Sequence, residues 1–84
     1  MDEVIARTQE LIDLWQNDVH EWEDRIFDQA LYASDSNPPQ VALDLKESIN
    51  HRRLHNLPGM FDYNDPQLGN KIFTICYWLA DNGW

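Results

Sequence analysis

The sequence contains few cysteines, glycines and prolines. It has one cysteine, Cys76, and only three glycines and four prolines in 84 residues. A lone cysteine excludes an internal disulfide and any metal site built from several cysteines, and it suits a reducing compartment such as the cytoplasm. No apolar run approaches the roughly 20 residues that a membrane-spanning helix needs. The acidic start at Asp2 and Glu3 has the wrong charge for a secretory signal. We therefore expect a cytoplasmic protein with no membrane contact.

Basic residues are also scarce, since six Lys and Arg stand against fifteen Asp and Glu, for a net charge of −9. This excess of carboxylates repels phosphate and argues against direct binding of nucleic acid. Hydrophobic residues still make up 43% of the chain, which is too many for a disordered acidic tail. Because so short a chain cannot divide a core in two, we expect residues 1–84 to form a single domain.

The first third of the chain predicts one long helix, over about residues 2–33. Residues 1–33 contain no glycine or proline, so nothing there interrupts a helix. Their apolar side chains recur in steps of three, four and seven, which draws one stripe along a helix. The stripe consists of Ile5, Ile12, Trp15, Val19, Trp22, Ile26 and Ala33. Such a helix would be roughly 50 Å long.

Two shorter helices are predicted to follow, over about residues 38–57 and 66–82. Each has apolar residues on one face, and residues 58–65 between them form a loop that carries aromatic side chains. No segment alternates with the period of a strand over more than a few residues. The predicted fold is all-α, a small three-helix bundle with one long N-terminal helix.

The ends of the two shorter helices are marked by capping signals. Asn37 precedes two prolines, and Asp65 precedes Pro66, which in both cases is a cap followed by a residue suited to the first turn. Pro58–Gly59 is expected to end the second helix. Asn82–Gly83 is expected to cap the third, so that Trp84 folds back onto the last turn.

A mismatch in length favours a dimer. The two short helices are each roughly 26 to 30 Å long, so a hairpin of the two covers only part of the long stripe. Either they pack end to end along the first helix, or a second chain covers the rest. We favour the dimer, with its interface formed by Trp15, Val19, Trp22 and Ile26.

Most of the net charge lies on the first predicted helix. Residues 1–33 carry −7, whereas residues 40–57 carry +1. Opposite the apolar stripe runs an acidic face, widened by Asp18 and Glu23, that consists of Glu3, Glu10, Asp13, Glu21, Asp24 and Asp28. Like charges three or four residues apart destabilise a helix, so this face brings no structural gain. It is either a solvated surface that keeps the protein soluble or a binding surface.

A row of carboxylates can occupy a basic groove that is built for DNA or RNA. In this composition the first helix resembles the DNA-mimic inhibitors that phages use against restriction and CRISPR systems. The resemblance implies a non-enzymatic protein that blocks a basic surface of a nucleic-acid-handling partner. The loop residues Met60, Phe61 and Tyr63 would anchor such a partner, or else plug the core. The main alternative is a structural or accessory subunit that self-associates through its aromatic stripe.

A second alternative is a metal-binding helical bundle. Polar residues step by three or four along the second predicted helix, namely Asp44, Glu47, His51 and His55, and a shorter set on the first is His20 with Asp24. Two histidines four apart can share a metal, and Glu47 can add a third ligand. A solvated helix face explains these residues better than a metal site does, so we predict no metal and no cofactor.

The remaining reactive residues do not indicate catalysis. The basic cluster of His51, Arg52, Arg53 and His55 is expected to pair with the acidic helix or to sit at the negative end of its own helix. Cys76 lies on an apolar stripe and is expected to be an inert core thiol. No phosphate-binding loop, nucleophile elbow or zinc signature appears, so we expect no enzyme.

Overall fold

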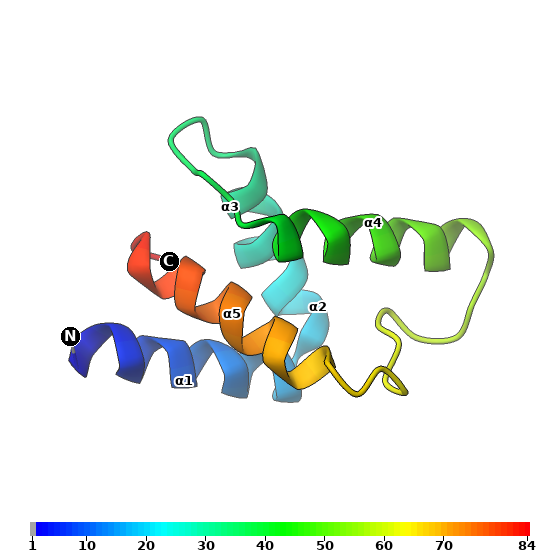
Figure 1. Ribbon diagram of the computed structural model, residues 1–84, viewed down its shortest axis with the longest axis horizontal. Helices are drawn as coiled ribbons and strands as arrows, with labels where there is room; N and C mark the ends of the chain where they lie inside the picture. Colours follow the sequence, from blue (N-terminus) through cyan, green and yellow to red (C-terminus); the bar gives the residue numbers. More distant parts are fainter. Residues whose placement is uncertain (1) are drawn as a thin grey trace.

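The computed structural model describes residues 2–84, and within that range it contains helices and loops but no strand. The helical elements are α1 (Asp2–Asn17), α2 (Val19–Glu21), η1 (Trp22–Phe27), α3 (Asp28–Tyr32), α4 (Gln40–Leu54) and α5 (Leu68–Asp81), shown in Figure 1. Since α2, η1 and α3 follow one another without a gap, residues 19–32 form one helical segment. The all-α prediction is confirmed, but residues 2–84 form four helical segments where three were predicted.

The predicted long helix over residues 2–33 is wrong, because the chain turns at Asp18. The backbone of this residue has φ −150° and ψ 80°, outside the helical region. Its side chain accepts a hydrogen bond from the backbone N–H of Glu21 (3.2 Å) and so caps the second segment. One residue earlier, the Asn17 side chain donates to the Asp13 carbonyl oxygen (2.8 Å). Short polar side chains compete with a helix for backbone groups in this way, and the chain leaves α1 in a new direction (Figure 1).

The segment after the turn contains a π-helical stretch, η1. The backbone N–H of Asp28 bonds to the carbonyl of Glu23, five residues back rather than four. Side chains five apart therefore come to lie above one another. Trp22 and Phe27 accordingly stack, with ring centroids 5.0 Å apart. The wider turn also lets two consecutive side chains, Trp22 and Glu23, both be fully buried.

Helices α1 and α5 lie side by side and antiparallel, so both ends of the chain are at the same side of the molecule (Figure 1). Arg7 ties these ends together by donating two hydrogen bonds to the main-chain oxygen of Trp84 (3.0 and 2.5 Å). The buried residues of α1 are Thr8 and Leu11. Ile5, which the sequence places on the apolar stripe, is 54% exposed. Because α1 ends at Asn17, its buried side is the side that contacts α5. The predicted apolar stripe, which continues to residue 33, does not determine it.

The predicted C-terminal cap of α5 is confirmed. Gly83 has φ +85°, the backbone N–H of Trp84 reaches the Leu79 carbonyl (2.9 Å), and that of Gly83 reaches Ala80 (3.2 Å). This pair of bonds is the Schellman motif, which folds Trp84 back over the last turn. At the other end the Asp65 side chain accepts from a backbone N–H two residues on (2.8 Å), and the helix begins at residue 68 rather than 66.

Helix α4 is shorter at both ends than the predicted 38–57. Its N-cap is Pro39, which offers no side-chain cap, so Asn37 does not play the predicted role. At its C-terminus Asn56 has φ +53°, and the backbone N–H of Leu57 bonds to the Arg52 carbonyl (2.9 Å). A left-handed asparagine therefore ends the helix, ahead of the Pro58–Gly59 that we expected to end it.

The core draws side chains from all four helical segments and from the loop before α5. Its members are Leu11, Trp22, Phe27, Ala30, Ala42, Leu45, Ile49, Phe61, Leu68, Ile72, Ile75, Cys76, Trp78, Leu79 and Ala80. The turn at Asp18 folds residues 19–32 over this core, so the two halves of the predicted stripe bury their apolar residues within one chain. The mismatch in length from which we predicted a dimer is thereby removed.

None of the helices in residues 2–84 combines the length and the apolar character that crossing a membrane requires.

Candidate functional site

The charged side chains divide into those that form ion pairs within the chain and those that do not. Within residues 2–84, five of the six Lys and Arg have a carboxylate oxygen within 4.0 Å. The exception is Arg52, which donates to the Pro58 carbonyl. These pairs use five of the fifteen Asp and Glu, which leaves ten with no ion-pair partner in the described part of the chain. All ten are exposed: Asp2, Glu3, Asp13, Asp18, Asp24, Asp35, Asp44, Glu47, Asp62 and Asp81.

The first half of the predicted acidic face lies on the outside of α1. Glu3, Glu10 and Asp13 are all exposed, and their spacing of seven and three residues places them on one side of the helix. Glu10 pairs with Arg7 at 3.0 Å, and Asp13 accepts a hydrogen bond from Gln9 at 2.9 Å. We name Glu3, Glu10 and Asp13 the α1 acidic face.

The second half of the predicted face does not continue the first, because the chain turns at Asp18. Glu21 pairs with Arg25 at 3.3 Å, and Asp28 lies 2.7 Å from the ammonium of Lys46 on α4. Of the three predicted residues only Asp24 is both exposed and without an ion pair. The six carboxylates that the sequence predicts to lie along one rod are therefore split between two directions.

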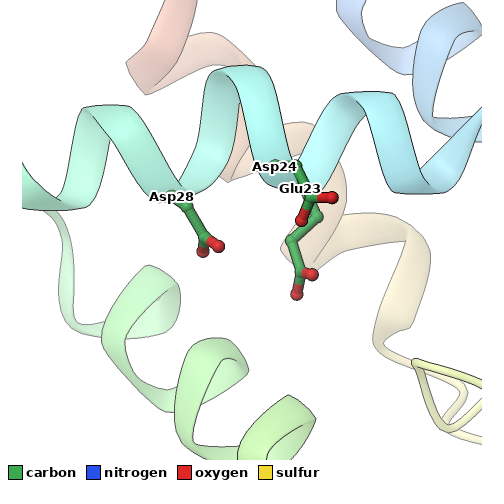
Figure 2. A group of neighbouring side chains, drawn as sticks. All are labelled: Glu23, Asp24 and Asp28. Atoms are coloured by element: carbon green, nitrogen blue, oxygen red, sulfur yellow. The ribbon is translucent and has the colours of Figure 1, made fainter.

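Three carboxylates of this second segment gather on the side that faces α4, as Figure 2 shows. One oxygen from each of Glu23, Asp24 and Asp28 lies within 4.8 Å of the others, a spacing that could hold a cation. The ammonium of Lys46 already lies among them, 2.7 Å from Asp28 and 3.6 Å from Glu23. Arg53, also on α4, pairs with the other oxygen of Glu23. Two protein cations thus occupy this cluster.

Glu23 is the centre of the ion network that links η1 to α4. Its side chain is fully buried, contrary to the prediction that it widens a solvated acidic band. A carboxylate taken out of water loses several kcal/mol of hydration, which only close cations and hydrogen bonds can offset. Arg53 and Lys46 supply that charge, and of the two Arg53 belongs to the basic cluster that was predicted to pair with the acidic helix. The network links η1 and α3 to α4, and it uses four charges internally.

Two of the three predicted loop anchors face inward. Phe61 is 1% exposed and meets the rings of Trp15 and Trp22 edge-on, at centroid distances of 5.7 and 6.1 Å. It plugs the core and is not available to a partner. Met60 is partly buried against the same core, whereas Tyr63 is 61% exposed beside Trp15, at 6.3 Å. Tyr63 is thus the one predicted anchor whose ring is largely open to solvent.

A pocket of about 370 Å³ lies beside that tyrosine, between the turn after α1, the end of α4 and the loop. Its lining consists of Val19, His20, Arg53, Gly59, Met60 and Tyr63. The loop closes over it because Gly59 adopts φ +77°, a conformation that L side chains rarely take. His20 lines this pocket, whereas Asp24 lies with the cluster that faces α4, and no ion pair joins the two among residues 2–84.

The residues predicted to join two chains are engaged within one chain. Trp22 has no exposed surface and stacks on Phe27, so it is a core residue. Trp15, Val19 and Ile26 are partly buried and pack against the same core. The physical reason is again the turn at Asp18, which brings both halves of the stripe toward α5 and α4.

Cys76 has the character that the sequence predicts. It is buried in α5 as a free thiol. Burial raises the pKa of Cys76 to about 12, so the nucleophilic thiolate is not formed near neutral pH.

The metal candidates predicted on the second helix (38–57) all lie on the exposed side of that segment, with His55 as the C-cap just beyond α4. Asp44, Glu47, His51 and His55 are each exposed, and Asp44 accepts a hydrogen bond from Gln40 at 2.9 Å. The two histidine rings lie beside each other, with centroids 4.4 Å apart.

Neither the scan against models of known protein families nor the comparisons with curated proteins and with solved structures gave a match to this chain.

Proposed function

We propose that this protein is a non-enzymatic acidic binding module of the cytoplasm, which blocks a basic, nucleic-acid-binding surface of another protein. One observation carries the proposal. Five of the six Lys and Arg are paired within the chain, while ten carboxylates remain exposed without an ion-pair partner among residues 2–84. The net charge of −9 is therefore a property of the outer surface that a partner would meet.

The α1 acidic face is the part of that surface best suited to binding. It lies on a regular helix of 16 residues, so its carboxylates are held by a rigid element rather than by a loop. Asp18 follows at the end of α1 and is also exposed. Tyr63 lies beside Trp15 of the same helix and supplies an exposed aromatic ring of the kind that anchors interfaces.

The chemistry of such a complex follows from the charges. A basic groove that normally binds phosphates attracts polyanions, and neutralising the charges of a polyanion releases the counterions that it held. Carboxylates on a helix offer that negative charge in place of a nucleic acid, and they attract the partner over several ångströms before contact. The expected partner is therefore a protein with a Lys- and Arg-rich surface, and its complex should weaken steeply as salt is added.

The test is capture of partners from an extract of the organism that encodes the chain, on three immobilised proteins. One is the natural chain. The second, the face variant, carries Glu3→Gln, Glu10→Gln and Asp13→Asn. The third is a matched control that also removes three negative charges, elsewhere on the surface, by Asp35→Asn, Asp44→Asn and Asp81→Asn. A short duplex DNA is then added to each bound set as a competitor.

We expect that the natural chain and the control retain a nucleic-acid-binding protein and that the face variant does not. The duplex should release this protein from the natural chain and from the control. Three surface charge contacts of about 0.5 kcal/mol each correspond to a loss of roughly tenfold in affinity. Retention that is equal on both variants, or that resists the duplex, would show that the α1 acidic face does not mimic nucleic acid.

A further inference from the structure

The exposed side of α4 carries a pair of histidines that the proposed function does not use. His51 and His55 are one helical turn apart, and their rings lie 4.4 Å apart between centroids, tilted by 45°. Both are exposed. Within the part of the chain that the structure describes, neither ring forms a side-chain hydrogen bond or an ion pair, so their nitrogen lone pairs are free for a ligand.

The neighbouring cations do not interfere with this pair. Arg52 turns away to donate to the Pro58 carbonyl, and Arg53 turns away to pair with Glu23. Glu47, one turn before His51, is exposed and has no ion-pair partner among residues 2–84. The face of α4 that holds residues 47, 51 and 55 therefore presents two imidazoles and a carboxylate with no competing positive group bonded to them.

The backbone beneath the pair is well fixed. Ala42, Leu45 and Ile49 bury the opposite side of α4 in the core. His51 lies in the last turn of α4 and His55 is the C-cap just beyond it, with φ −98° and ψ 11°, and the backbone N–H of His55 still bonds to the His51 carbonyl at 3.1 Å. A site built on such an element keeps its ligands in register, and only side-chain rotation is needed to point both rings at one ion.

We propose that His51 and His55 form a surface site for a first-row divalent transition metal of the nickel, copper and zinc class, with Glu47 available as a third ligand. Imidazole is the commonest protein ligand for these ions, which bind its nitrogen at about 2.0–2.1 Å. Two histidines on successive turns bind one ion from one side, and water fills the remaining positions. Affinity should follow the order copper above nickel and zinc. Magnesium, which prefers oxygen ligands, should not use this site.

The test is calorimetric titration of the whole chain with Ni²⁺, Zn²⁺ and Mg²⁺. Single variants His51→Gln and His55→Gln are compared with His20→Gln, which removes the third histidine of the chain from a different site. Circular dichroism confirms that each variant is folded, as expected for exposed side chains. Asp24→Asn is a second control, because it removes one member of the carboxylate cluster that faces α4.

We expect one Ni²⁺ or Zn²⁺ per chain, with affinity reduced about tenfold or more by His51→Gln and by His55→Gln, since even the loss of an outer-shell partner costs metal sites 10–100-fold. His20→Gln and Asp24→Asn should leave it unchanged. Failure of the natural chain to bind either ion, or binding that survives both α4 substitutions, would overturn the proposal. So would an equal loss on removal of Asp24, which would assign the ion to the carboxylate cluster. None of these outcomes depends on the α1 acidic face.

Discussion

The two sides of this molecule are held together by different forces. On one side α1 and α5 pack through apolar side chains, with Arg7 bonded to Trp84 as a polar tie at the end. On the other side α4 is joined to the second helical segment by buried charges as well as apolar contacts, since Glu23 meets Arg53 and Lys46. In this acidic chain, most of the few basic side chains form ion pairs with carboxylates of the same chain. The carboxylates without an ion-pair partner among residues 2–84 are all exposed at the surface.

The difference also explains where the unpaired carboxylates of α1 lie. Apolar packing between α1 and α5 needs no cations, so the outer side of α1 keeps its carboxylates uncovered apart from the pair between Glu10 and Arg7. On the α4 side the carboxylates Glu23 and Asp28 turn inward and are neutralised. The basic partner proposed above would meet unpaired carboxylates of α1 on the side built by apolar contacts.

The largest expected effect comes from Trp22, which both sides share because it stacks on Phe27 and meets Phe61. Trp22→Ala should lower the free energy of unfolding by about 4 kcal/mol, from lost burial and the cavity that remains. Denaturant unfolding followed by fluorescence or circular dichroism measures it. If instead the variant kept its stability and only lost self-association, the residue would belong to an interface between chains, as the sequence alone suggests.

Removing Glu23 should disrupt the ion network between η1 and α4. Glu23→Ala leaves Arg53 and the largely buried Lys46 without their shared carboxylate and should cost about 3 kcal/mol of unfolding free energy. Glu21→Ala is the matched control, because it breaks the exposed pair with Arg25 and should cost less than about 1 kcal/mol. Equal losses in the two variants would mean that the buried network contributes no more than a surface pair.

The turn between the two sides depends on the cap at Asp18. Asp18→Ala removes the side-chain acceptor for the Glu21 backbone N–H and should lower the free energy of unfolding by about 1 kcal/mol. Asp18→Asn retains an acceptor oxygen and serves as the control, with a smaller loss expected. An alanine variant as stable as the natural chain would show that packing alone sets the turn.

The smallest effect is expected at the ion pair before α5. The hydrogen bond from Lys71 lowers the pKa of Asp65, with a further lowering from the backbone N–H of Gln67. Since the folded-state pKa lies below the ordinary value of 3.8, this contact stabilises the fold above that pH, and its contribution is lost as the pH falls through the lowered pKa. Lys71→Met should raise the pKa of Asp65 toward 3.8, which NMR titration of the carboxyl measures. An unchanged pKa would assign the whole shift to the backbone bond.

Local signals in the sequence were sufficient for part of the fold. The Gly83 cap, the start of α5 near Asp65 and the inert character of Cys76 all follow from residues close together in the chain. The turn at Asp18 does not, because an aspartate within a helical run is usually a surface residue, and its role as a cap appears only once the next segment packs elsewhere.

The candidate site was predictable to a similar extent. The exposure of Glu3, Glu10 and Asp13 follows from helical spacing. Burial of Glu23 was missed, since it depends on a π-helical turn and on Arg53, a partner thirty residues away. A signal was present in the basic residues of the predicted second helix, whose pairing with the acidic helix was expected but could not be assigned to a particular carboxylate.

The most direct test of the account is the affinity of a captured, purified partner for three proteins, measured by titration at low and high salt. The three are the natural chain, the face variant without the charges of Glu3, Glu10 and Asp13, and the control that loses three other charges. The account predicts that the natural chain and the control bind alike, that the face variant binds roughly tenfold more weakly, and that salt weakens all three. Equal affinity of the face variant and the control would contradict it, because the charge of the whole surface, and not the α1 acidic face, would then determine binding.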